Sequence, residues 1–243
     1  MAATRVTAEA MVPTYSEEAA LLADGYSLIA GLDEAGRGPL AGPVVAGVVI
    51  LPPDPRGKWV EWVKDSKQLT AAQRERVLPY ILEHALGAAP GVATADEIDA
   101  IGIAPATRLA MMRALNSLAF MPQYLLLDAF PLPDAALPQK PIIHGDALCL
   151  SIAAASIVAK VARDRLMHEQ HDIFPEYGFA QHKGYGTGDH LRHLERLGPC
   201  AIHRYSFAPI RTWGYQRTVI RVPSPSMVAR PSMADGQPGK KGP

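Results

Sequence analysis

The strongest constraint on the fold is an uncharged run, VVAGVVIL, at residues 44–51. A β-branched run without charges is typical of a strand that is buried on both faces. A shorter apolar run at 28–30 precedes it, and the connection between them carries Asp33 and Glu34. Asp-Glu pairs at strand ends are commonly solvated turn residues. Because this pair connects two core strands, we expect its carboxylates to lie beside the core.

Along the rest of the chain, the pattern predicts strands and helices in a β-β-(α)-β-α-β order, followed by helices. Strands are expected in 27–51 (a hairpin-like pair), 89–95, 123–130 and 142–147, and helices in 69–86, 105–120, 150–171 and, after a glycine-rich loop, within 181–198. Thr70 is the expected N-cap of the first helix, and Pro79 is expected to kink or split it. This order indicates an α/β core with an appended C-terminal helical part.

The chain has 243 residues, of which 48% are hydrophobic, and this is enough for one large core. We expect one domain over residues 25–222, with its helical C-terminal part beginning near 172. The Ala-rich segment 1–24 has no clear period and is expected to be a flexible extension. The segment 223–243 is rich in Pro, Ser and Gly and is expected to be a disordered tail.

Charge and targeting signals narrow the function classes. Lys plus Arg and Asp plus Glu number 24 each, so no overall positive field favours a polyanionic partner. The charge is unevenly distributed, because residues 1–50 are net acidic and residues 156–221 net basic, so the two segments could face each other across a site. Two isolated cysteines, the absence of a signal-peptide pattern and the lack of an apolar run of about 20 residues predict a cytoplasmic protein without a membrane partner. No pattern suggests a coiled coil, and we expect a monomer.

Three aspartates share a position in the pattern. Asp33, Asp128 and Asp146 each close a predicted apolar strand, and Glu34 adjoins the first. Neighbouring strand ends would bring these groups together, and clustered carboxylates raise one another's pKa unless a cation is present. Oxygen ligands suit Mg²⁺ or Mn²⁺, and two such ions about 4 Å apart can activate water and stabilise the leaving oxygen of a phosphodiester. The alternative is that the four residues form separate structural ion pairs.

Two glycine-rich segments could contact a sugar-phosphate chain. The turn Gly36-Arg37-Gly38 offers backbone N–H groups and a cation beside the carboxylates. Lys183 and Tyr185 could present an ammonium group and a ring to a nucleic acid. Taken alone, the first segment is more typical of a plain turn and the second of ordinary packing, and the first gains weight only from its position next to Asp33 and Glu34.

The remaining polar candidates are ambiguous. Lys67, in KDSKQLT, could contact phosphate or lie in a solvated loop. His182, His190 and His193 could suggest zinc, yet no HExxH pattern or cysteine partner accompanies them. We expect these histidines to belong to a polar helix face.

Six segments, taken in order from about residue 27 to 211, resemble one known family. They are GLDEAGRGPLAGPVVAGVVIL, DSKQL, the strand end at Asp128, GDALCLSIAAASIVAKVARD, HKGYGT and HRYSFAP. Together they resemble bacterial ribonuclease HII, the type 2 ribonuclease H. The resemblance implies a ribonuclease H-like mixed sheet flanked by helices. It also implies Mg²⁺- or Mn²⁺-dependent cleavage of RNA in RNA–DNA hybrids, and 5′ to ribonucleotides embedded in duplex DNA, leaving 3′-OH and 5′-phosphate ends.

The resemblance assigns the four catalytic carboxylates to Asp33, Glu34, Asp128 and Asp146, and all four positions carry a carboxylate here. We expect Asp33, Glu34 and Asp128 to bind the metal, in a two-metal site. Asp164 is a less favoured alternative to Asp146, because it lies well inside a predicted helix.

The resemblance also implies the substrate contacts. The backbone of Gly36, Arg37 and Gly38 would contact the 2′-OH, the group that distinguishes RNA from DNA. Tyr185 would stack on the following deoxyribose and so favour an RNA–DNA junction. Lys67 would contact phosphate.

Two departures from the family pattern leave the placement of Asp146 open: His144 stands where a lysine is more common, and Ala129 follows Asp128 where a glycine is common. The same features allow two other functions, a catalytically silent nucleic-acid-binding module on the same fold and a different two-metal nuclease such as a junction resolvase. Intact carboxylates argue against the first, since a binder gains nothing from acids facing phosphate. The turn that senses a 2′-OH argues against the second.

Overall fold

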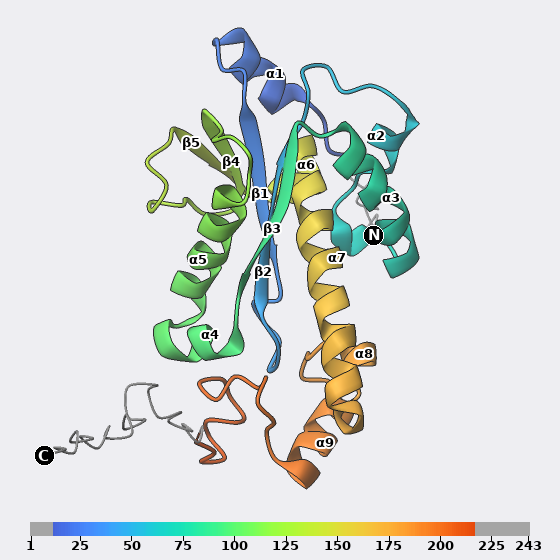
Figure 1. Ribbon diagram of the computed structural model, residues 1–243, viewed down its shortest axis with the longest axis vertical. Coiled ribbons are helices and arrows are strands. Elements are labelled where there is room, and N and C mark those ends of the chain that lie inside the picture. The colour runs from blue at the N-terminus through green and yellow to red at the C-terminus, as the bar shows by residue number, and fades with distance from the viewer. Residues whose placement is uncertain (1–11, 217–243) are drawn as a thin grey trace, which may run out of the picture.

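Five strands form one mixed sheet in the order β3-β2-β1-β4-β5 in the computed structural model, which describes residues 12–216 (Figure 1). β1 pairs antiparallel with β2 and parallel with β4, while β3 joins β2 antiparallel and β5 joins β4 parallel. The strands are β1 (Ile29–Ala35), β2 (Val44–Ile50), β3 (Gly87–Ala93), β4 (Tyr124–Asp128) and β5 (Gln139–Ile142). The predicted α/β class with a mixed sheet is confirmed.

Helices cover both faces of this sheet. In Figure 1, α4 and α5 lie on one side, and α7 lies on the other side with α2 and α3 beyond it. α8 and α9 lie at the far end of α7 and form the appended C-terminal helical part. The helices are α1 (Ser16–Ala23), α2 (Lys58–Trp62), α3 (Ala71–His84), α4 (Ala95–Ile101), α5 (Ile103–Asn116), α6 (Gly145–Leu148), α7 (Leu150–Ile173), α8 (Phe179–His182) and α9 (Gly188–Leu197).

The run that dominates the sequence forms β2, every residue of which is buried. Successive side chains point to opposite faces of a strand. Val48 and Ile50 therefore pack in the cluster that contains Met111 of α5, while Val49 packs with Ile157 of α7. Burial on both faces is the reason that this strand carries neither charges nor alternation.

The long helix α7 lies unusually close to the sheet. A Cβ atom added at Gly47 of β2 would lie 2.2 Å from the carbonyl oxygen of Ala155 in α7. Glycine on the strand and alanines on the helix therefore allow close contact between the two backbones. At the start of α7 the packing is equally close, because a Cβ atom added at Gly31 of β1 would lie 2.2 Å from the carbonyl carbon of Ser151. This part of α7 follows directly on the short helix α6, which carries Asp146.

Two local predictions were wrong. The segment expected to be a strand at 142–147 is a strand only to Ile142, because His144 adopts a left-handed conformation with φ of +59° and the chain then forms α6. Pro79 does not split α3, which begins at the predicted N-cap Thr70 and continues to His84. Pro79 lies on the exposed face, so water can satisfy the carbonyl that the proline leaves without a donor.

Part of the expected flexible extension is a packed helix. Residues 1–24 were expected to be mobile, yet in α1 Leu21 and Glu18 are buried. Leu21 packs against Leu126 and Ile152. Residues 1–11, and the whole of the expected tail at 223–243, lie outside the described residues. Between residues 12 and 216, no helix combines the length and apolar content required to cross a bilayer.

Glu18 caps the N-terminus of α7 from a distant part of the chain. Its Oε1 accepts hydrogen bonds from the Ser151 N–H at 2.7 Å and from the Cys149 thiol at 3.1 Å. The N-terminus of a helix carries unpaired N–H groups and a partial positive charge, so a carboxylate is stabilising there. No local pattern in the sequence marks this contact, which is the physical reason that α1 was not predicted.

Replacing Glu18 with Ala should lower the free energy of unfolding by about 1–3 kcal/mol, because it leaves the buried Ser151 N–H unpaired. Chemical denaturation of the variant and the parent would measure this. Glu17→Ala is the matched control, since Glu17 only forms a partly exposed ion pair with Lys140 at 2.7 Å. The control should change stability by less than about 1 kcal/mol. Equal losses in the two variants would contradict the capping role.

Candidate active site

Three aspartates meet at one end of the central strands. Asp33 lies near the end of β1, Asp128 is the last residue of β4, and Asp146 lies in α6. β1 and β4 are adjacent and parallel, with Leu32 in register with Leu127, so the aspartates that follow are brought side by side. One carboxylate oxygen of each aspartate lies within 4.8 Å of those of the other two. The structure therefore brings together the three strand-end aspartates of the sequence pattern.

This cluster concentrates negative charge in a dry environment. Asp33 and Asp146 are each only 4% exposed. Burial, and then repulsion from Glu34 and Asp128, raise the pKa of Asp33 well above its usual value. Burial and the nearby Asp146 also raise the pKa of Asp128, although the Gly145 N–H donates to its Oδ1 at 2.8 Å. Asp33 and Asp128 are therefore held close together with too little positive charge around them.

Glu34 adjoins the cluster but does not belong to the closest group. Its Oε1 accepts from Arg37 at 3.3 Å, while its Oε2 is buried and has no hydrogen-bond partner among the described residues. Burial raises the Glu34 pKa even though Arg37 opposes the shift. The expected metal-binding set was Asp33, Glu34 and Asp128, whereas the three residues that the structure brings closest include Asp146 instead of Glu34.

Lys67 lies beside the carboxylates and contacts one of them. Its Nζ is 2.6 Å from Oδ2 of Asp146, and its side chain is 75% exposed. Partial burial alone would lower the pKa of Lys67, but the hydrogen bond and attraction from Asp146 outweigh it, so the pKa is raised. An exposed ammonium group at the rim of the cluster can reach a phosphate of a bound strand.

Asp164, the alternative fourth acid, belongs to a different network. It pairs with Arg74 at 3.3 Å and with Lys160 at 2.7 Å. Arg74 in turn donates to the carbonyl of Ser66 at 2.7 Å, next to Lys67. Asp164 therefore supports the lysine loop from α7 and does not join the carboxylate cluster.

The turn Gly36-Arg37-Gly38 is held from behind by a buried arginine. Arg204, fully buried, donates to the carbonyls of Gly36 at 2.6 Å and of Arg37 at 2.8 Å. The N–H groups of the three turn residues donate no hydrogen bond within residues 12–216. With its carbonyls turned inward, the turn keeps its N–H groups available to a ligand.

A second buried arginine connects this turn to the loop of Tyr185. Arg163 of α7 donates to the carbonyl of Pro43 at 3.0 Å and to that of Lys183 at 3.0 Å. Its guanidinium carbon lies 5.8 Å from the centre of the Tyr185 ring, which is 44% exposed. Sequence reasoning assigned no role to Arg163 or Arg204, although both lie in quoted motifs, VARD and HRYSFAP.

The histidines do not form the expected polar helix face. His190 is fully buried, and His182 lies in α8 instead of α9. The zinc alternative gains no support, because the group of possible metal ligands in the described part of the chain consists of carboxylates. The prediction failed because the rings of His182 and His190 stack on each other and His190 packs against Phe179.

The two departures from the family pattern coincide with unusual backbone. Ala129 has φ of +61° and His144 has φ of +59°. Glycine adopts this left-handed region without a steric penalty, whereas other residues enter it at a cost. The glycine that is common after the strand-end aspartate thus suits the conformation found here, and Ala129 adopts it nevertheless, with Asp128 close to Asp33 and Asp146.

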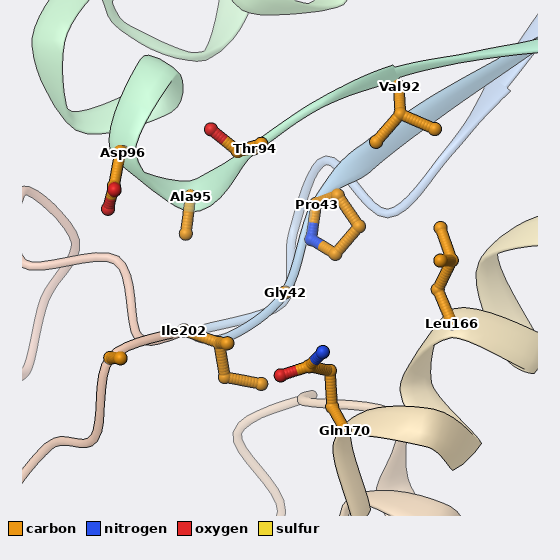
Figure 2. Close-up of a pocket in the computed structure, with 10 residues that line it drawn as sticks. Gly42, Pro43, Val92, Thr94, Ala95, Asp96, Leu166, Gln170 and Ile202 are labelled. Carbon is orange, nitrogen blue, oxygen red and sulfur yellow. The ribbon is translucent and has the colours of Figure 1, made fainter. Parts of the chain in front are cut away.

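A cavity of about 370 Å³ lies away from these residues, between Val92 and Thr94 at the end of β3, Leu166 and Gln170 of α7, and Ile202 (Figure 2). None of the predicted site residues lines it, and its lining is mainly apolar. It offers no cation for phosphate. The carboxylate cluster, and not this cavity, is the candidate for chemistry.

Solved structures identify the class of protein that this fold defines. The chain is similar to the ribonuclease H2 from Pyrococcus horikoshii OT3, with a TM-score of 0.65 and 28% identity over 76% of this chain and 96% of that one. It shares its fold with the RNase HII in the PCNA complex from Archaeoglobus fulgidus, with a TM-score of 0.62 and 22% identity over 79% and 98% of the two chains. The fold is that of the ribonuclease H enzymes.

The particular family follows from the sequence comparisons. The profile of the Ribonuclease HII family matches residues 30–210. The Ribonuclease HII of Dehalococcoides mccartyi is 53% identical over 203 residues, which are 84% of this chain and 96% of that protein. That of Chloroflexus aurantiacus is 52% identical over 202 residues, 82% and 95% of the two chains. The chain belongs to the ribonuclease HII family and is an endoribonuclease.

The two glycines of the Gly36-Arg37-Gly38 turn should differ in how well they tolerate a side chain. Gly36 has φ of +90°, and a Cβ there would lie 1.9 Å from Nε of the buried Arg163, whereas a Cβ at Gly38 would meet nothing within 4 Å. We expect Gly36→Ala to lower the free energy of unfolding by at least about 1–3 kcal/mol through strain and overpacking. Gly38→Ala should leave it within about 0.5 kcal/mol. Similar melting of both variants would show that Arg163 does not confine the turn.

Proposed function

We propose that the chain hydrolyses the RNA strand of RNA–DNA hybrids and nicks duplex DNA on the 5′ side of embedded ribonucleotides, with Mg²⁺ or Mn²⁺, leaving 3′-OH and 5′-phosphate ends. The convergence of Asp33, Asp128 and Asp146 beside a turn with open N–H groups is the observation that carries the proposal.

The donor set fits a hard divalent cation. The ligand atoms are all carboxylate oxygens, which suit Mg²⁺ and Mn²⁺. The raised pKa values of Asp33 and Asp128 and the unpartnered Oε2 of Glu34 indicate a site with too little positive charge. Asp33, Asp128 and Asp146 would hold the ions, with Glu34 beside them. Bound there, the ions would lower the pKa of the attacking water and neutralise charge on the scissile phosphate.

The chain's own residues would bind and orient the substrate. The N–H groups of Gly36 and Gly38 donate no hydrogen bond within residues 12–216 and could bind a ribose hydroxyl or phosphate oxygen. Lys67 and Arg37 are partly exposed at the rim and can pair with phosphates. Tyr185 offers an exposed ring face for stacking on a sugar. These contacts recognise the backbone and the 2′-OH without reading a base sequence.

We assign the catalytic domain to residues 25–222, with its helical part from about 172, and add to it helix α1, which packs against the core. We expect a monomer that acts in the cytoplasm. The family profile covers residues 30–210, nearly all of this range. Sedimentation of the full chain would show whether it is a monomer.

Cleavage of a labelled duplex that contains one ribonucleotide tests the proposal. We expect a single cut on the 5′ side of the ribonucleotide with Mg²⁺ or Mn²⁺, no cut with a chelator, and no cut in an all-DNA duplex of the same sequence. Asp128→Asn should lower kcat by at least about 100-fold, because it removes charge from the cluster, while hybrid binding is retained. Retained binding by the parent chain without cleavage under any metal would support the silent binding module instead, and cleavage of the all-DNA duplex would support a different nuclease.

Tyr185→Ala tests recognition of the junction. Loss of a stacking contact worth about 1–3 kcal/mol should lower kcat/KM about 5- to 150-fold on the single-ribonucleotide duplex. A long RNA–DNA hybrid offers many cleavable positions, so its cleavage should fall much less. Tyr185→Phe keeps the ring and should restore most of the activity. Equal losses on both substrates would contradict the junction role.

A further inference from the structure

The loop that carries Tyr185 lies on three packed imidazoles, those of His182, His190 and His203, which we call the histidine network. His190 and His203 are fully buried, and their Nε2 atoms are 3.0 Å apart. The rings of His182 and His190 stack with centroids 4.3 Å apart. None of these groups lies in the carboxylate cluster, so the proposed chemistry leaves them unexplained.

The contacts allow one arrangement of protons. A carbonyl oxygen only accepts, so Nδ1 of His190, which is 2.9 Å from the Tyr185 carbonyl, must carry a proton. In a neutral ring, Nε2 of His190 is then an acceptor, and the proton in the contact between the rings belongs to Nε2 of His203. Nδ1 of His203 must therefore accept, and it does so from the Cys200 N–H at 2.9 Å.

His182 completes the network on the other side of the loop. Its Nε2 is 2.7 Å from the Tyr177 carbonyl and so donates. Its Nδ1 is left as an acceptor and takes a hydrogen bond from the Gly184 N–H at 3.1 Å. Imidazoles thus hold the N–H of Gly184, the residue before Tyr185, and the carbonyl of Tyr185 itself.

The network requires neutral rings. An imidazolium has two donors and no acceptor, so a charged His190 would put a donor against the donor of His203. Burial first, and then the neighbouring histidines, lower the pKa of His190 to about 4 and that of His203 to about 3. Both rings are therefore neutral at the pH at which the cell would use the site.

We propose that His190, held in one tautomer by His203, is a positioning residue that orients Tyr185 for recognition of the RNA–DNA junction. The inference rests on the proposed function of Tyr185. It does not follow from burial alone: a histidine that merely filled the core would not need a defined proton on each nitrogen, whereas the carbonyl of Tyr185 and the N–H of Cys200 define both ends of this chain of contacts.

Substitutions in the histidine network test the inference by their effect on cleavage of a single-ribonucleotide duplex compared with a long hybrid. His190→Ala should lower kcat/KM on the single-ribonucleotide duplex by at least about 5-fold, as loss of correct stacking would, and change cleavage of a long hybrid by less than about 2-fold. His190→Asn retains a donor near the position of Nδ1 and should recover most of the loss. His193→Ala is the matched control, because His193 also lies in α9 but contacts the Tyr177 carbonyl at 3.2 Å instead of Tyr185. The control should show no selective loss.

A double variant and a spectrum complete the test. Tyr185→Ala with His190→Ala should be no more impaired than Tyr185→Ala alone, because both changes remove one function. If His190→Ala does not fold, His203→Ala, which frees the tautomer of His190, takes its place. Nitrogen–proton NMR of the histidine-labelled parent chain should show the proton on Nδ1 of His190 and on Nε2 of His203, and the opposite tautomers would overturn the inference.

The outcomes separate the two proposals. If Tyr185→Ala is selectively impaired while His190→Ala is not, the positioning inference fails and the junction role stands. If His190→Ala loses activity equally on both substrates, it acts on the fold and the inference fails. If Tyr185→Ala itself shows no selective loss, the junction role fails and the positioning inference fails with it.

Discussion

A buried guanidinium connects the parts of this molecule that must act together. Arg163 extends from α7, the helix packed against the central strands, and donates to the carbonyls of Ala41, Pro43 and Lys183 at 3.0–3.2 Å. Its remaining nitrogen, Nη1, is buried without a hydrogen-bond partner in the described part of the chain, and the guanidinium lies near the Tyr185 ring. A buried charge is costly unless polar groups surround it. The carbonyls of two loops supply that environment, so the arginine and both loops depend on one another.

The charges of the carboxylate cluster, unlike that of Arg163, are only partly compensated by the groups around them. Its members repel one another and are desolvated, and Lys67 compensates only Asp146 directly. Such an arrangement costs stability in the absence of a cation, and it persists because adjacent parallel strands and the close packing of α7 determine where the side chains lie. The rigid sheet thus holds the carboxylates in an arrangement that costs folding free energy as long as no positive charge is bound among them. The same repulsion is compatible with a cation site and does not fit a set of separate structural ion pairs.

Local sequence signals predict the sheet and most of the carboxylate cluster. They fail where contacts between distant parts of the chain determine the local structure. The uncharged run of β2 and the strand end at Asp128 predicted their structure because burial imposes a composition on a strand. Asp146 was predicted at the end of a strand because apolar residues precede it in the sequence. The left-handed conformation of His144, which changes the direction of the chain, has no local sequence signal. Helix α1 and the histidine network depend on partners far away in the sequence, such as Glu18 with Ser151, and no periodicity records those contacts.

Chemistry and recognition use different parts of the fold. The carboxylates lie at the ends of strands and on a helix fixed against the sheet, where positions are least able to shift, and in-line attack on a phosphate depends on such precision. The groups proposed to recognise the 2′-OH and the junction lie on loops, which are held in shape by buried arginine and histidine side chains. Because these supports contact backbone atoms and not the carboxylates, a change in Arg204 or His190 can alter which substrate is cut without altering how it is cut. On the proposed function, specificity therefore depends both on the groups that touch the substrate and on the buried side chains that hold their loops in shape.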